Sequence, residues 1–338
     1  MARTPAVDQP IPANPADVLT VGGIRLPLWR RAWVLLAAIT AIGLTFVLED
    51  FSLFQLTNGC IYAIAIIGLM LLTGFNGQFS LGHSAFYAIG AYTAAIMMDQ
   101  WQVAYFWTLV PAGIICLIAG FLFGLPALRL GGLYLALATF ALAVATPQLL
   151  KYEPFEHWTG GVQGLDLDKP VSPLESLNDD QWIYLFTLVV LALLVYGAWN
   201  LVRGRTGRAM IAIRDNPLAA QTMGINTALY KSLTFGVSGL FTGVAGALSA
   251  IAIQFVAPDS FTFILAISFL VGLVVGGLVS IPGAIFGGMF ILYVPNLTED
   301  FQGLAWTAYG IVLIVAVYVM PMGAAGLVKM MTAKLIRR

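Results

Sequence analysis

Ten stretches of mainly apolar residues alternate with short polar or glycine-rich links along most of the chain. They lie near residues 30–48, 55–73, 80–98, 105–125, 132–150, 182–202, 231–256, 261–276, 283–297 and 305–322. A helix needs roughly 20 apolar residues to cross the hydrocarbon core of a bilayer. The eighth and ninth stretches are shorter, so they form either two full crossings or a re-entrant pair of half-helices. The pattern predicts an all-α polytopic membrane protein with about 10 transmembrane helices, or about 8 plus the re-entrant pair.

Composition agrees with this assignment. Hydrophobic residues make up 60% of the 338 residues and charged residues 9%, whereas about 25% of the residues of a soluble globular protein are charged. The apolar composition makes the lipid bilayer the expected partner. The formal net charge is zero, so there is no electrostatic reason to expect nucleic acid as a partner. Cys60 and Cys116 lie in different apolar stretches. They are expected to be buried small hydrophobes, with no disulfide or metal site.

The distribution of positive charge predicts which side the termini face. With a cytoplasmic N-terminus and an even number of crossings, fourteen of the sixteen lysines and arginines fall inside, as the positive-inside rule requires. Residues 1–28 are polar and proline-rich without the apolar core of a signal peptide, and are expected to form a disordered cytoplasmic tail. Residues 29–325 are the expected transmembrane domain, and residues 326–338 a basic cytoplasmic tail.

The same distribution narrows the mechanism. No acidic or basic residue needs to lie at mid-membrane, where each costs about 2.5–3.5 kcal/mol. This argues against an ion-coupled carrier, although backbone carbonyls can hold Na⁺. The chain has no Gly-Lys pair and hence no phosphate-binding loop of the Walker type. Any ATP must therefore be bound by another chain, and no enzyme activity or cofactor is expected in this one. A channel or carrier acting alone is the alternative.

A polar, glycine-rich stretch at residues 73–87 joins the second and third apolar segments. Unpaired backbone groups are tolerated at membrane depth only inside protein or along a wet cavity. The stretch is therefore either a discontinuous helix that lines a substrate path or a tight cytoplasmic turn packed through small residues. His83 and Ser84 are a poor catalytic pair, because adjacent residues do not face each other on a helix. The candidate path residues are Asn76, Gln78, Ser80, His83, Ser84 and Tyr87.

A short helix is predicted at residues 217–223. Asp215 or Asn216 can cap its N-terminus, Pro217 suits the first helical position, and Gly224 can end it. A run of arginines precedes it, and long apolar segments stand on both sides. The helix is either offered to a soluble partner on the positive side of the membrane or is part of an ordinary connecting loop.

The longest link, residues 151–181, is expected on the periplasmic side. It contains seven acids, two lysines and the turn-forming sequence Thr159-Gly160-Gly161. Loops of this length usually have a function of their own. Docking or gating is therefore expected, and a solvated acidic loop without a partner is the alternative.

Several separate patches resemble the permease subunits of branched-chain amino-acid ABC importers, a family for the uptake of hydrophobic amino acids. They are Leu72–His83, Gly90-Ala91-Tyr92, Thr159-Gly160-Gly161, Gly207–Asn216, Ala219-Ala220 and Met223-Gly224-Ile225. Their order, and the long loop with Thr-Gly-Gly, are similar to the LivM-like member of the usual permease pair. The resemblance implies a multi-pass subunit of the bacterial inner membrane that imports branched-chain amino acids by alternating access. Close relatives carry urea, short amides and other amino acids.

The resemblance also implies partners and site residues. The partners are a homologous LivH-like permease, two ATPase subunits that bind ATP and Mg²⁺, and a periplasmic solute-binding protein that docks at Thr159, Gly160 and Gly161. Ala-Ala-x-x-x-Gly is the core of the loop through which such permeases engage their ATPases, but Leu218 stands where that loop has glutamate. We expect Arg214 and Asp215 to replace the missing charge. The expected coupling residues, in a cytoplasmic loop at 203–229, are Arg208, Arg214, Asp215, Asn216, Ala219, Ala220 and Gly224.

Overall fold

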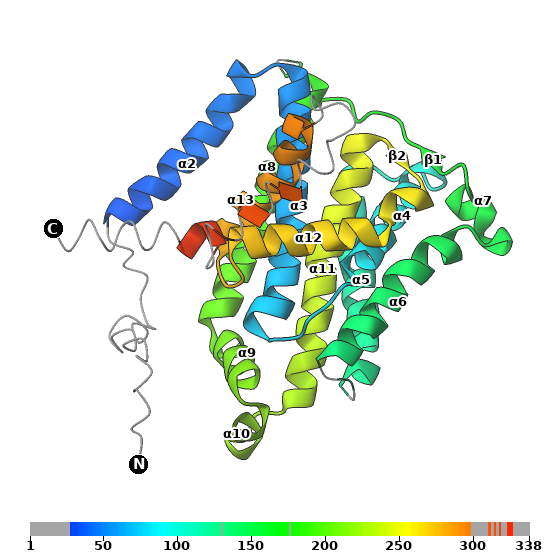
Figure 1. The fold of residues 1–338 in the computed structure, drawn as a ribbon. Helices are drawn as coiled ribbons and strands as arrows, with labels where there is room; N and C mark the ends of the chain where they lie inside the picture. Colours follow the sequence, from blue (N-terminus) through cyan, green and yellow to red (C-terminus); the bar gives the residue numbers. More distant parts are fainter. Residues whose placement is uncertain are drawn as a thin grey trace, which may run out of the picture. The chain divides into compact units, whose positions relative to one another are not determined.

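The computed structural model describes residues 28–128, 130, 132–175, 177–298, 310, 311, 314, 315, 318 and 323–326. The chain divides into an N-terminal unit, Met1–Leu44, and a main unit, Thr45–Arg338. Helix α2 (Leu28–Val47) belongs mostly to the first and is a single apolar helix. Figure 1 shows the elements of the main unit. They are α3 (Asp50–Leu69), the π-helix η1 (Met70–Phe75), α4 (His83–Asp99), α5 (Tyr105–Ala127), α6 (Leu133–Leu150), η2 (Glu153–Phe155), α7 (Glu156–Thr159), β1 (Leu165–Asp166), α8 (Asp179–Arg203), α9 (Arg205–Asp215), α10 (Pro217–Thr222), α11 (Thr227–Ile253), β2 (Phe255–Val256), η3 (Pro258–Phe261), α12 (Phe263–Gly276) and α13 (Ile281–Thr298).

The described helices confirm an all-α polytopic membrane protein. Nine of the ten predicted segments coincide with helices α2, α3, α4, α5, α6, α8, α11, α12 and α13. Within the described residues, five helices are long and apolar enough to cross a membrane: α3 with η1, α5, α6, α8 and α11. Of the tenth predicted segment, 305–322, the structure describes only residues 310, 311, 314, 315 and 318, and the two predicted tails lie almost wholly outside the described residues.

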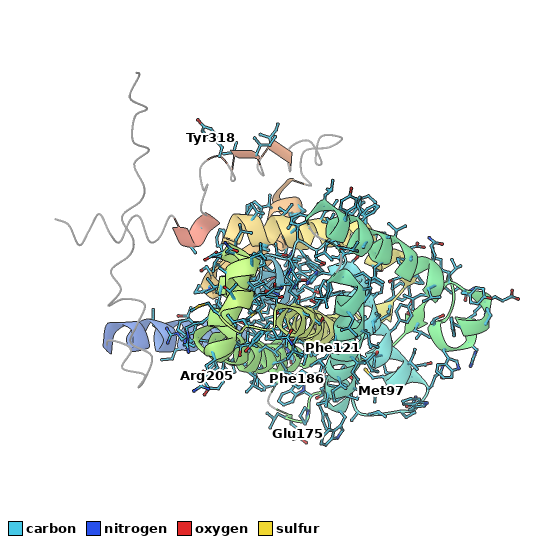
Figure 2. All side chains as sticks on the ribbon, turned by 90° about the horizontal axis from the view of Figure 1, so that it is seen from below. Met97, Phe121, Glu175, Phe186, Arg205 and Tyr318 are labelled. Atoms are coloured by element: carbon cyan, nitrogen blue, oxygen red, sulfur yellow. The ribbon has the colours of Figure 1, made fainter. Side chains whose placement is uncertain are left out.

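Helices α3 and α11 form the interior of the main unit, and they are each 83% buried over their most apolar window. Figure 2 looks along α11 and shows Phe121 of α5 beside it. The contacts of α11 are made through small residues. A Cβ on Gly243 would meet the Cys116 side chain of α5, and one on Gly246 would overlap the Tyr87 carbonyl of α4. Close approach of backbones is the usual way in which helices associate in a bilayer.

Helices α12 and α13 form a hairpin in which α12 is shorter than the helices around it. The 14 residues of α12 extend about 21 Å at 1.5 Å per residue, less than the roughly 30 Å of hydrocarbon. In both views α12 is oriented across the direction of α11 (Figures 1 and 2). Glycines close the hairpin, because a Cβ on Gly276 would overlap the backbone of Gly283 and one on Gly272 would touch the Gly287 carbonyl.

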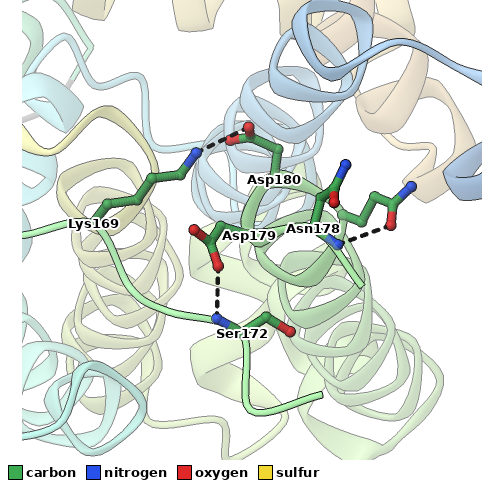
Figure 3. A network of polar contacts seen from close by, with 6 residues as sticks. Lys169, Ser172, Asn178, Asp179 and Asp180 are labelled. Carbon is green, nitrogen blue, oxygen red and sulfur yellow. Dashed lines mark hydrogen bonds and ion pairs between the residues drawn. The ribbon is translucent and has the colours of Figure 1, made fainter. Parts of the chain in front are cut away.

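The long link between α6 and α8 is ordered by contacts with the α11–α12 connection. Strands β1 and β2 pair antiparallel, with Leu165 opposite Val256. Lys151 Nζ lies 2.5 Å from Asp259 Oδ1. Further along, Lys169 Nζ lies 3.0 Å from Asp180 Oδ2, at the start of α8 (Figure 3). Two-residue strands leave no alternating pattern, so the sequence did not predict this pairing.

Candidate functional site

The polar stretch after α3 is a buried break between two helices. Helix α3 continues into the π-helix η1, residues 76–82 are non-helical, and α4 starts at His83. Two glycines permit this path. Gly77 has φ +73°, a conformation that favours glycine, and a Cβ on Gly74 would overlap the backbone carbonyl of Leu278 in the α12–α13 turn. The discontinuous-helix interpretation therefore describes the backbone better than a tight surface turn.

His83 lies in a chain of hydrogen bonds that holds the break against α11. Gly82 N donates to Ser80 Oγ at 3.3 Å, and Ser80 Oγ lies 3.3 Å from His83 Nδ1. His83 Nε2 lies 2.7 Å from Ser238 Oγ, which donates to the Gly68 carbonyl at 2.7 Å. Because the Ser238 hydroxyl gives its hydrogen to Gly68, it accepts from His83, so the proton of the neutral ring is on Nε2. The chain starts at a backbone N–H and ends at a backbone carbonyl, which gives His83 a structural role.

Gln78 and its neighbours are also fixed by specific bonds. Gln78 Nε2 donates to the Lys231 carbonyl of α11 at 3.2 Å, and Gln78 N donates to the Leu72 carbonyl at 3.1 Å. Leu81 N donates to Thr139 Oγ1 of α6 at 2.9 Å. The break is therefore attached to both α6 and α11 by hydrogen bonds that bridge distant parts of the sequence.

Three of the six candidate path residues keep unused hydrogen-bonding capacity within the described part of the chain: Asn76 and Ser84, and Tyr87 through its hydroxyl. Asn76 is 2% exposed and Ser84 is fully buried. Within the described part of the chain, neither the amide of Asn76 nor the hydroxyl of Ser84 has a hydrogen-bond partner. Buried polar groups usually have partners, so these two are better placed than Gln78, Ser80 and His83 to meet a polar solute. Contact of any of these residues with substrate stays a prediction.

Tyr87 belongs to an aromatic cluster between α4 and α12. Its ring centroid lies 6.0 Å from that of Phe261 and 5.4 Å from that of Phe269. Phe261 also packs on Tyr92, with centroids 6.0 Å apart. The cluster places Tyr87 on the side of α4 that contacts α12, and its predicted role in a substrate path stays untested.

The predicted short helix exists as α10 and is capped as expected. Asn216 Oδ1 accepts from Ala219 N at 3.1 Å, Pro217 is the first helical residue, and Gly224 has φ +84°. Ala220 is buried, whereas Leu218 and Met223 are 75% and 83% exposed. The structure therefore selects Asn216 over Asp215 as the capping residue, and α10 presents two large apolar side chains.

The arginine-rich run before α10 is itself a helix, α9, which the sequence analysis treated as a link. It buries Ala209, Met210 and Ile213. Helices α9 and α10 enclose a groove of about 600 Å³, with Arg205 and Arg208 among its lining residues. The spacing of the three buried apolar residues, at i, i+1 and i+4, is the sequence signal that would have identified this helix.

Arg214, at the end of α9, contacts the helix break. Its NH1 donates to the Gly74 carbonyl at 3.0 Å. Its Nε and NH2 lie 3.0 Å from Asp215 Oδ1, and the Arg214 side chain is 33% exposed. The two residues predicted to replace the missing glutamate are therefore paired with each other, and one of them also binds the break.

The Thr-Gly-Gly sequence stabilises the conformation of the long link through local hydrogen bonds. Thr159 is 5% exposed, its Oγ1 donates to the Leu150 carbonyl at 2.8 Å, and it accepts from Gly161 N at 3.2 Å. Gly160 and Gly161 both have positive φ. A pocket of about 320 Å³ lies nearby, with Asp99, Asp166 and Asp168 among its lining residues. Docking at Thr159, Gly160 and Gly161 stays a prediction.

These features define a multi-pass α-helical membrane protein with a buried helix break and an exposed, capped helix pair. The family model described as "Branched-chain amino acid transport system / permease component" matches residues 51–320. The high-affinity branched-chain amino acid transport system permease protein LivM of Salmonella typhimurium is 30% identical over 319 residues, covering 87% of this chain and 74% of LivM. LivM of Escherichia coli is 29% identical over the same shares, and LivH of Salmonella typhimurium is 27% identical over 80% of this chain and 92% of LivH. No solved structure gives a significant match.

The chain belongs to the family of permease components of the branched-chain amino acid transport system. The resemblance to LivM-like permeases that was drawn from the sequence patches is thereby confirmed.

Proposed function

We propose that the chain is one of two permease subunits of an ATP-binding-cassette importer, and that it moves branched-chain amino acids from periplasm to cytoplasm. The observation that carries the proposal is the α9–α10 pair. Leu218 and Met223 are large apolar side chains that are 75% and 83% exposed, beside a groove lined in part by Arg205 and Arg208. Apolar anchors rimmed by charge are typical of a surface that binds another protein. The proposed occupants are the ATPase subunits, which bind ATP and Mg²⁺.

The proposed topology places both termini in the cytoplasm of a bacterium, with the chain in the inner membrane. The charge distribution supports this topology, because Lys151 and Lys169 are the only two of the sixteen lysines and arginines that fall in the extracytoplasmic links. In this topology α9 and α10 are cytoplasmic, and the link 151–178 is periplasmic. The short length of α12 supports a re-entrant α12–α13 pair.

The proposed partners occupy different faces. The large apolar side chains exposed on α5, α6 and α8 face lipid or a second, LivH-like permease. The long link between α6 and α8 faces a periplasmic solute-binding protein. Relatives named LivM and LivH, which both belong to a high-affinity branched-chain amino acid transport system, support a pair of homologous permeases.

The proposed substrate is small and carries no net charge. Among the described residues, the buried polar side chains are those of Thr, Ser, Asn, Gln and His, with no Asp, Glu, Lys or Arg. An unpaired ion would be costly in such surroundings, whereas the zwitterion of leucine, isoleucine or valine can be met by neutral hydrogen-bonding groups. Urea and short amides satisfy the same condition, and the names of the relatives favour amino acids.

The test is reconstitution with the partner permease, the ATPases and the binding protein, followed by ATP-driven uptake of labelled leucine with unlabelled urea as competitor. We expect uptake that urea leaves unchanged. Leu218→Asp should remove the ATPases from the purified complex, whereas Val171→Asp, at a loop position that is 77% exposed, should retain them. Uptake into liposomes that contain this chain alone would contradict the proposal and favour a channel or an ion-coupled carrier. Competition by urea would assign the importer to amides.

A further inference from the structure

We propose that Arg214 is a positioning residue that joins the α9–α10 pair to the helix break, so that the two move as one body during transport. The inference rests on the proposed function, since it concerns how motion at the ATPase surface reaches the membrane interior. It assigns Arg214 to a contact within this chain, where the resemblance had suggested a contact with the ATPase.

The first contact is a charge-assisted hydrogen bond to the end of the π-helix. Arg214 NH1 donates to the Gly74 carbonyl at 3.0 Å. Residues 76–82 are not helical, so the Gly74 carbonyl has no donor from a following helical turn, whereas the Leu72 carbonyl of η1 accepts from Gln78 N. A guanidinium is a strong donor for such a carbonyl. The bond therefore completes the end of the helix from outside it.

The second contact is made by the aliphatic part of the same side chain. Gly77 has φ +73°, and a Cβ built there would lie 2.7 Å from Arg214 Cγ and 3.3 Å from Arg214 Cβ. The stem of Arg214 thus rests on the bare backbone of Gly77, while its head binds Gly74. Together the two contacts hold Gly74 and Gly77 on either side of Asn76, whose amide has no hydrogen-bond partner among the described residues.

The third contact links this clamp to α10. Arg214 Nε and NH2 both lie 3.0 Å from Asp215 Oδ1, and Asp215 directly precedes Asn216, the residue that caps α10. One planar guanidinium therefore spans the distance from the break to the start of α10. Lysine has a single ammonium group and cannot reproduce this fork.

The break is also in contact with the α12–α13 turn, where the Leu278 carbonyl faces Gly74. A shift of α9 that moves Gly74 must therefore be accommodated by that turn as well. Arg208 differs, because it lines the groove between α9 and α10 and its NH1 reaches the Arg203 carbonyl at 3.5 Å. The two arginines of one helix thus have separable roles.

The first experiment compares Arg214→Ala and Arg214→Lys with Arg208→Ala in the reconstituted complex. Three quantities are measured: ATPase subunits bound per permease, ATP hydrolysis with loaded binding protein, and leucine uptake. Arg214→Ala should keep ATPase binding within about twofold of wild type and should keep ATP hydrolysis. Its leucine uptake per ATP hydrolysed should fall at least about tenfold. Arg214→Lys should show an uptake per ATP between those of wild type and Arg214→Ala. Arg208→Ala should lower ATPase binding itself. Loss of ATPase binding in Arg214→Ala to the extent seen for Arg208→Ala overturns the proposal.

The second experiment replaces the clamp by a covalent bond in Gly77→Cys/Arg214→Cys. The 3.3 Å between the two Cβ positions is close to the roughly 3.5–4.5 Å spacing of disulfides. Reduced protein should be uncoupled, and oxidation should restore at least half of wild-type uptake. An oxidised complex that hydrolyses ATP without uptake shows that joining the two parts does not restore coupling, and the proposal is then wrong. Each single cysteine variant with oxidant is the control. If wild type binds no ATPase, the proposed function fails, and the clamp is not at fault.

Discussion

The membrane helices of the main unit form two groups of overlapping hydropathy. The groups differ in how much of each helix is buried by other helices. Helices α3 with η1 and α11 are each 83% buried over their most apolar window, whereas the figure is 33% for α5 and α6 and 17% for α8. The buried pair carries close-contact glycines such as Gly68 and Gly246, and α11 supplies Ser238 and Lys231 as partners of the break, whereas the exposed three carry many large apolar side chains on their outer faces. Hydropathy thus identifies a span, while small and polar residues identify its place in the bundle.

The physical reason is that lipid tails are as apolar as leucine, so burying a leucine between helices gains little in a bilayer. Close backbone contact and hydrogen bonds gain more. The predictions below test this contrast by changing matched positions on inner and outer helices.

Gly90→Val should have the largest effect. A Cβ on Gly90 of α4 would overlap the Gly243 backbone of α11, and overpacking costs roughly 1–3 kcal/mol and occasionally more. We expect aggregated protein, or a melting temperature in detergent many degrees below wild type. Gly197→Val on α8 is the control, because no atom lies within 4 Å of its Cβ position. Equal melting temperatures for the two variants would show that small residues do not define the interior.

His83→Leu should come next. It removes the link between Ser80 and Ser238 and leaves each of these buried hydroxyls with one partner fewer, at a cost of about 1–3 kcal/mol, with the lower end expected in a membrane. Ser268→Ala is the matched control, since the bond from Ser268 Oγ to the Ile264 carbonyl, at 3.0 Å, stays within α12. Thermal unfolding in detergent measures both. A His83→Leu protein as stable as Ser268→Ala would remove the structural role assigned to the histidine.

Asn178→Ala should cost about 0.5–2 kcal/mol by removing the capping box of α8. In this box the Asn178 backbone N donates to Gln181 Oε1 at 3.1 Å (Figure 3), and the Asn178 side chain, which alanine lacks, accepts from the backbone N–H of Gln181. Asn226→Ala removes the equivalent cap of α11, where Leu229 N donates to Asn226 Oδ1 at 3.1 Å. We expect similar losses, because caps lie at helix ends irrespective of burial. A much larger loss at Asn226 would mean that the inner helix governs unfolding.

Asp259→Asn should have the smallest effect. The Lys151–Asp259 pair is 23% and 69% exposed, and such pairs contribute roughly 0–1 kcal/mol. The loss should shrink further at high salt, because mobile ions screen exposed charges. Melting curves of wild type and variant at low and high salt measure this. A large loss that is independent of salt would show that the pair is more buried than these fractions indicate.

Sequence alone was sufficient for the spans and for α10, because both depend on local signals. The apolar length of a span and the order Asn216, Pro217 and Gly224 are visible without tertiary contacts. The π-helix could not be predicted from local signals, because its position depends on a tertiary contact. Gly74 meets Leu278, about two hundred residues later in the chain. Helix α9 was not predicted, because its arginines are typical of a polar link and its apolar face is narrow.

The candidate site was predicted as a group of residues and not as a set of roles. The polar stretch 73–87 was predicted to be either a discontinuous helix or a tight cytoplasmic turn, and its hydrogen-bond partners come from elsewhere in the chain: Ser238 and Lys231 on α11 and Thr139 on α6. Only these contacts separate His83 and Gln78, which are bonded, from Asn76 and Ser84, which have no partner within the described part of the chain. Sequence reasoning had no means to make that division.

The pairing of β1 with β2 has a consequence for any protein that binds the link between α6 and α8. Closing a long free loop lowers chain entropy, and each doubling of loop length adds only about 0.6 kcal/mol to that cost. Here the pairing of Leu165 with Val256 orders the link within the folded chain. A partner that binds the link near Leu165 therefore meets a segment that is already anchored, and less of the association free energy goes into ordering it.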